Sequence, residues 1–70
     1  MNSKRDRFKR LAEQRTNIVL HRLKVLGNCA NRSAYEYSEG EIVKIFFTIE
    51  QAVKQTKAKF HFPHQKKFKL

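Results

Sequence analysis

The fold is decided by residues 38–53, which read SEGEIVKIFFTIEQAV. Ser38 and Glu41 stand three positions apart directly before an apolar run, a spacing typical of a capping box that starts a helix. Winding the segment at about 100 degrees per residue gathers its apolar side chains on one stripe. The stripe consists of Ile42, Ile45, Phe46, Ile49, Ala52, Val53 and Phe60. We therefore predict an amphipathic helix from Ser38 to about Lys59, ending before Pro63.

A longer helix is predicted upstream, from about Lys4 to Leu26. Ser3 is the expected N-cap, because its hydroxyl can accept from the amide of Asp6 while the Asp6 side chain reaches back. Gly27 is expected to end this helix, since glycine readily adopts the left-handed conformation after a last turn. The apolar arc of the helix is broader than one neighbouring helix would cover. This arc contains Phe8, Leu11, Ala12, Ile18, Val19, Leu23, Val25 and Leu26.

Eleven residues, 27–37, connect the two predicted helices. Helix-turn-helix motifs use only about three or four residues, so we expect a packed, ordered loop instead. Two successive long amphipathic helices favour an antiparallel pair. The predicted fold is all-α: an antiparallel two-helix hairpin over residues 1–60 with a basic tail at residues 61–70. Hairpins this small often pair into four-helix dimers, which would also cover the wide arc of the first helix.

The composition limits the class of protein. Seventy residues with 16 Lys or Arg against six Asp or Glu carry a net charge of +10. So short a chain disfavours an active site, and we expect no enzyme, no cofactor and no small-molecule substrate. The single Cys29 is expected as a small buried loop thiol in a cytoplasmic protein. No apolar run can span a membrane. His61 and His64 lack the further ligands of a metal site, because Pro63 interrupts any helix there and no acid or thiol is near.

Charge is concentrated at the two ends of the sequence. The net charge is +6 over residues 1–26, zero over 27–37, −1 over 38–56 and +5 over 57–70. In an antiparallel hairpin the two basic ends become neighbours and repel each other unless a polyanion neutralises them, and nucleic acid is the commonest polyanion. The predicted nucleic-acid-binding residues are Lys4, Arg5, Arg7, Lys9, Arg10, Lys57, Lys59, Lys66, Lys67 and Lys69. A solvated face, a membrane-surface helix or a nuclear-import sequence are the alternatives for these cations.

The tail interleaves aromatic rings with cations. Rings can stack on unpaired bases while lysines contact phosphates, as in proteins that bind single-stranded nucleic acid. The predicted base-stacking residues are Phe60, Phe62 and Phe68. The alternative is a frayed terminus without a specific role.

Several residues break the helical patterns and indicate a protein partner. Arg15 and Arg22 fall inside the apolar arc, where arginine needs a partner. Either they pair with acids of the loop and second helix, or they open toward a phosphate or a protein. The candidate acids are Glu36, Glu39, Glu41 and Glu50.

Val43 and Phe47 lie off the main stripe and form a second contact surface, unless loop tyrosines or the tail cover them. The predicted partner contacts are Arg15, Arg22, Arg32, Tyr35, Tyr37, Val43 and Phe47.

The loop carries a motif. It reads Leu26-Gly27-Asn28, then Asn31-Arg32, then Tyr35-x-Tyr37, with Arg15-x-Asn17 before it and Lys57-Ala58-Lys59-Phe60 after it. Over roughly residues 8–60 the chain resembles a family of small basic proteins found in prokaryotic genomes and mobile elements. The resemblance implies a fold rather than an activity. It also implies that Asn28, Asn31, Arg32, Tyr35 and Tyr37 either lock the turn or form a recognition patch, and asparagines that bond their own backbone favour the lock.

The sequence therefore predicts a non-enzymatic protein that binds RNA or DNA, alone or as a subunit of a larger nucleoprotein assembly. The basic helix start and the basic tail would form its binding surface. The alternative is an adaptor or inhibitor that docks on an acidic partner protein through its arginines and Phe47.

Overall fold

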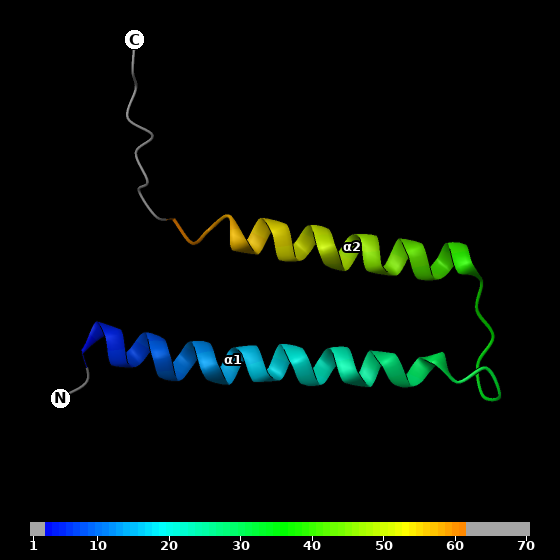
Figure 1. Ribbon diagram of the computed structural model, residues 1–70, viewed down its shortest axis with the longest axis horizontal. Coiled ribbons are helices and arrows are strands. Elements are labelled where there is room, and N and C mark those ends of the chain that lie inside the picture. Colours follow the sequence, from blue (N-terminus) through cyan, green and yellow to red (C-terminus); the bar gives the residue numbers. More distant parts are fainter. Residues whose placement is uncertain (1–2, 62–70) are drawn as a thin grey trace, which may run out of the picture. The chain divides into compact units, whose positions relative to one another are not determined.

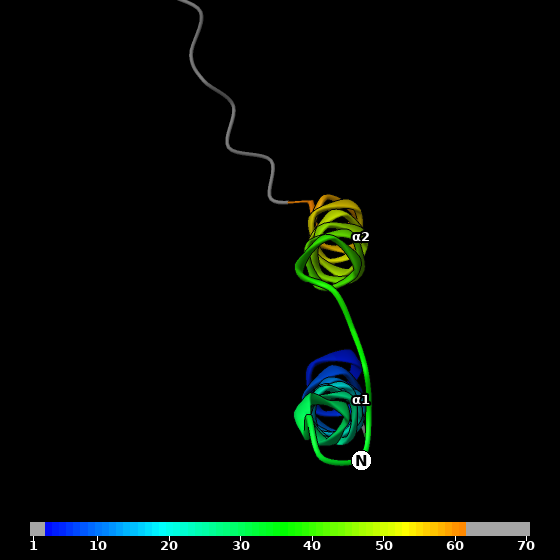
Figure 2. The same cartoon turned by 90° about the vertical axis from the view of Figure 1, so that its right-hand side faces the viewer.

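The computed structural model describes residues 3–61, which form two α-helices (Figure 1). The first helix, α1, spans Lys4–Gly27, and the second, α2, spans Glu39–Lys57. A short 3₁₀ turn at Asn28–Ala30 follows α1. Each helix winds without a break in both views (Figure 2), and the described part of the chain contains no strand. The prediction of an all-helical chain with two long helices is confirmed.

The chain divides into two compact units, Met1–Glu36 and Tyr37–Leu70, each built around one helix. Among the described residues, no two Cα atoms twelve or more positions apart in the chain lie within 8 Å of each other. The contacts that define each unit are therefore local in sequence. The antiparallel packing of the hairpin stays a prediction.

The start of α1 follows the predicted N-cap. Ser3 has an extended backbone, with φ −72° and ψ 167°, and its Oγ accepts from the amide of Asp6 at 3.1 Å. The carboxylate of Asp6 lies in the first turn, where the helix dipole favours a negative charge. The serine satisfies one of the backbone donors that the first turn leaves without an intrahelical acceptor.

The end of α1 differs from the prediction. Gly27 is the last helical residue and has right-handed dihedrals, φ −60° and ψ −24°, and no described residue has a positive φ. The chain tightens from the α-helix into the 3₁₀ turn, with the amide of Asn28 donating to the carbonyl of Val25. The left-handed end at Gly27 is therefore wrong, because the right-handed winding continues through this turn. The helix includes one residue beyond the predicted end at Leu26.

The capping box of α2 is confirmed in both directions. The Glu41 amide donates to Ser38 Oγ at 3.1 Å, and the Ser38 amide donates to Glu41 Oε1 at 2.8 Å. The helix ends at Lys57, two residues before the predicted end at Lys59. Beyond it the amide of Lys59 donates to Thr56 at 3.1 Å and that of Phe60 to Lys57 at 3.0 Å, so the winding tightens before Pro63.

The connection between the helices is ordered by its own backbone. Asn31 Oδ1 accepts from the Ser33 amide at 3.0 Å, and the Asn31 carbonyl accepts from the amides of Ala34 at 3.1 Å and Tyr35 at 2.9 Å. This asparagine-centred turn supports the interpretation that Asn31 locks the loop. The residues from Asn28 to Glu36 are all exposed. The expected packed loop with a buried Cys29 is therefore wrong, since local hydrogen bonds give the loop its order and leave Cys29 exposed.

No described residue is buried. Six residues are half-buried: Leu11, Ala12, Leu26, Tyr37, Ile42 and Ile49. Five of them belong to the predicted apolar arc of α1 or the predicted stripe of α2. Hydrogen bonds along the helix and caps at its start hold each helix, while most of its apolar surface remains in contact with water.

Replacing Ser38 by alanine should weaken α2, because the Glu41 amide loses its acceptor, the Ser38 hydroxyl. The expected loss of helix stability is about 1 kcal/mol, measured as lower helicity and a lower thermal midpoint in far-ultraviolet circular dichroism. The control is Ser33→Ala, which keeps the Ser33 amide bond to Asn31. An equal effect of the two substitutions would contradict the role of the cap.

The capping box should also make α2 sensitive to acid. The Ser38 amide and hydroxyl bond the ionised carboxylate of Glu41 and lower its pKa. This contribution to helix stability is complete above the ordinary pKa of glutamate and is lost as the pH falls through the lowered value. In an NMR titration the Ser38 amide shift should follow the Glu41 carboxylate. Glu41→Gln should abolish this dependence and Glu39→Gln should preserve it; a titration unchanged in Glu41→Gln would refute the assignment.

Candidate nucleic-acid interface

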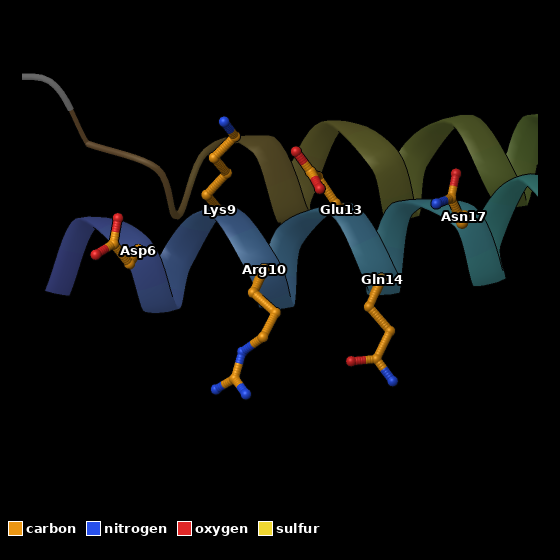
Figure 3. Close-up of a pocket in the computed structure, with 6 residues that line it drawn as sticks. All are labelled: Asp6, Lys9, Arg10, Glu13, Gln14 and Asn17. Atoms are coloured by element: carbon orange, nitrogen blue, oxygen red, sulfur yellow. The ribbon is translucent and has the colours of Figure 1, made fainter. Parts of the chain in front are cut away.

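Five cations surround the first two turns of α1. They are Lys4, Arg5, Arg7, Lys9 and Arg10, and all are exposed. Consecutive side chains leave an α-helix about 100 degrees apart, so five cations within seven residues distribute around it. Figure 3 shows this for two of them, since Lys9 and Arg10 leave opposite sides of the ribbon. An anion can therefore approach this segment from several directions.

Repulsion within the segment raises its affinity for anions. Lys4 and Arg7 are three residues apart and Arg5 and Lys9 are four apart, so both pairs are neighbours on the helix surface. Each such pair of like charges costs roughly 0.2–0.5 kcal/mol. Asp6 is the one acid among residues 4–10, and the N-terminal end of the helix dipole adds a partial positive charge. A bound phosphate backbone would relieve this repulsion.

A shallow polar hollow runs along α1 beside these cations (Figure 3). It is lined by Asp6, Lys9, Arg10, Glu13, Gln14 and Asn17. Asp6 and Arg10 are four residues apart, as are Lys9 and Glu13, so acids and bases alternate along the hollow. Glu13, Gln14 and Asn17 were not predicted as site residues. Steps of three and four residues along the helix, starting from Lys9 and Arg10, are the sequence signal that places them beside these cations. Since residues of α1 alone line the hollow, it offers no enclosure for a small molecule.

The second predicted cluster lies at the end of α2. Lys57 is the last residue of the helix, where the dipole favours a cation, and Lys59 and Phe60 follow it in the terminal turn. All three are exposed, and 60% of the Phe60 surface is accessible for stacking. The remaining predicted contacts lie outside the described residues: Phe62, Lys66, Lys67, Phe68 and Lys69.

The predicted partner contacts divide between the two units. Arg15, Arg22, Arg32 and Tyr35 belong to the first unit, and Tyr37, Val43 and Phe47 belong to the second. Arg15 and Arg22 are exposed on α1. Pairing of these arginines with acids of the loop and α2 stays a prediction.

The second surface on α2 is strongly exposed. Val43 has 63% and Phe47 60% of its surface accessible, against 44% for Phe46 on the predicted stripe. Both residues lie four positions apart and so share one side of the helix. Two residues of the predicted stripe are about as exposed, Val53 at 57% and Phe60 at 60%, so the contact surface at Val43 and Phe47 stays a prediction.

Across residues 3–61, neither a metal-ligand cluster nor a membrane-spanning helix is present. No three His, Cys, Asp or Glu side chains gather there in a way that could hold a metal ion. Neither described helix combines the length and hydropathy needed to cross a membrane.

Comparison with known proteins gives no relative from which a function could be transferred. No protein-family model, curated protein or solved structure matches this chain.

Proposed function

We propose that this chain is a non-enzymatic protein that binds RNA or DNA through the basic start of α1 and the basic residues at and beyond the end of α2. The observation that carries the proposal is the ring of exposed cations on the first two turns of α1. Phosphate contacts supply most of the affinity in sequence-independent nucleic-acid binding, and they require this kind of accessible charge.

The proposal includes an antiparallel hairpin of α1 and α2. The apolar arc of α1 and the apolar stripe of α2 are each exposed to water when the helix stands alone, and packing them together releases that water. Antiparallel packing brings the segment 4–10 beside Lys57 and Lys59. The two basic clusters then form one surface, large enough to follow a phosphate backbone.

A purely solubilising role explains the cations less well. Solubility requires dispersed charge of modest magnitude, whereas these cations are concentrated at the two ends of the sequence and repel each other at helical spacing. Phe60 beside Lys59 also supplies an aromatic ring at the point where single-stranded bases would need one. Both features favour a polyanionic ligand with exposed bases.

Spin labels at Gln14 and Gln51, in a chain with Cys29→Ser, should test the hairpin. Antiparallel helices pack about 8–10 Å apart, so the labels should lie within about 25 Å of each other. Gln14 is thirteen residues from the loop end of α1 and Gln51 is twelve residues from the loop end of α2, about 18–20 Å each, so helices that extend in opposite directions would separate the labels by more than about 35 Å. Pulsed electron resonance measures this distance. A label pair at Asn17 and Lys24 within α1 calibrates it, and a long distance between Gln14 and Gln51 would refute the hairpin.

Binding to a generic oligonucleotide should weaken steeply with salt. If about six to eight cations contact phosphates, affinity should fall by roughly three to four orders of magnitude between about 50 and 200 mM salt. Arg7→Ala with Arg10→Ala should reduce the salt slope by about two, and removal of residues 61–70 should also weaken binding. The matched control, Lys24→Ala with Lys44→Ala, removes equal charge elsewhere and should change the slope little. A flat slope in fluorescence anisotropy would overturn the proposal.

A further inference from the structure

The apolar arc of α1 consists of parallel lines of side chains. Residues seven apart on an α-helix lie almost above one another, with a drift of about 20 degrees per step. One line consists of Leu11, Ile18 and Val25, and another of Ala12, Val19 and Leu26. Between these two apolar lines runs a third, which consists of Phe8, Arg15 and Arg22. The two arginines are therefore flanked by apolar side chains on both sides.

We infer that Arg15 and Arg22 form the centre of a docking surface for an acidic amphipathic helix of another protein. The partner helix places two carboxylates seven residues apart on the side that faces α1, with apolar residues between them. This surface is separate from the nucleic-acid interface and goes beyond the function proposed above.

Two helices are needed to cover the two apolar lines of α1. Ile18 is 51% exposed and Val19 55% exposed, on opposite sides of the arginine line. One packed helix covers a stripe of about 100 degrees, whereas the arc of α1 extends over about 160 degrees. In the proposed hairpin α2 covers one apolar line, and the other line remains for a second helix. The arginines then lie at the edge where the second helix is seated.

The arginines specify the chemistry of that second helix. Covering the apolar line removes water from the neighbouring guanidinium groups, and this is costly unless each receives a charged partner. A carboxylate fits a guanidinium with two parallel hydrogen bonds. Seven helical residues rise about 10.5 Å, so carboxylates seven positions apart on a roughly parallel or antiparallel helix match Arg15 and Arg22.

Neither α2 nor a second copy of this chain provides two carboxylates seven residues apart on an apolar face, although Glu50 of α2 lies level with Arg15 in the proposed hairpin. The acids of α2 are Glu39, Glu41 and Glu50, and their separations are two, nine and eleven residues. The one pair of acids seven apart in the whole chain is Asp6 and Glu13. Both line the polar hollow of Figure 3, and the side chains between them there are Lys9 and Arg10, which are charged rather than apolar. The occupant is therefore a different protein.

Nucleic acid fits this surface less well than a protein helix does. A phosphate backbone could pair with Arg15 and Arg22, but it would leave Leu11, Ile18 and Val25 against charged, hydrated groups. Most of the cations on residues 4–10, in contrast, are not flanked by apolar side chains and so suit a phosphate backbone better. Arginine within an apolar surround is instead typical of the centre of protein interfaces.

Two synthetic peptides and the full chain test the inference. The matched peptide is an amphipathic helix of 21 residues whose leucine face carries two glutamates seven residues apart, and the second peptide has the same composition with both glutamates on the opposite face. Anisotropy titrations should show at least tenfold tighter binding of the matched peptide. Arg15→Glu with Arg22→Glu should remove this preference, and a matched peptide with lysines in place of the two glutamates should restore binding to the double variant.

The control variant, Lys24→Glu with Lys44→Glu, changes the same charge away from the arc and should keep the preference for the matched peptide within about threefold. Equal binding of the two peptides to the unchanged chain would overturn the inference, even if the double variant lost its helicity. Two other results would also overturn it. One is a dimer in sedimentation that dissociates in the double variant, which would assign the surface to a second copy. The other is oligonucleotide affinity that falls at least tenfold further in the double variant than in the control.

Discussion

The structure depends on a single constraint: each helix forms through local interactions but cannot by itself bury its apolar side. Caps at Ser3 and Ser38 satisfy backbone donors and fix where the helices begin. The caps do not cover the apolar arc of α1 or the stripe of α2, and no described residue is buried. Covering these surfaces would release water from apolar side chains and stabilise the fold.

Local sequence signals predicted the helices well and their ends less well. The capping box at Ser38 and Glu41 was predictable because it is formed entirely by residues three positions apart. Gly27 misled the prediction, since glycine permits a left-handed residue without requiring one, and the 3₁₀ turn needs none. Cys29 was expected in a packed loop, yet the loop is ordered by the hydrogen bonds of Asn31. Sequence composition does not distinguish a loop ordered by packing from a loop ordered by local hydrogen bonds.

The candidate site could be predicted as a set of residues but not as one surface. Runs of cations such as Lys4–Arg10 are visible in the sequence, and helical winding alone shows that they surround α1. Whether they join Lys57 and Lys59 depends on contacts between residues far apart in the chain, which no local pattern specifies. The same distinction applies to Arg15 and Arg22: periodicity locates them within an apolar arc, whereas the partner that neutralises them must be inferred from charge and spacing.

The turn around Asn31 has a consequence for the order in which surfaces are occupied. The eleven-residue connector has its own hydrogen bonds, which restrict its conformations, and it links α2 covalently to α1. Tethering of this kind corresponds to an effective concentration on the order of millimolar for one helix in the vicinity of the other. Few free proteins in a cell reach that level. The tethered helix α2 would therefore bind to the apolar arc of α1 before a helix of another protein does. That other helix could then contact only the part of the arc that α2 leaves exposed.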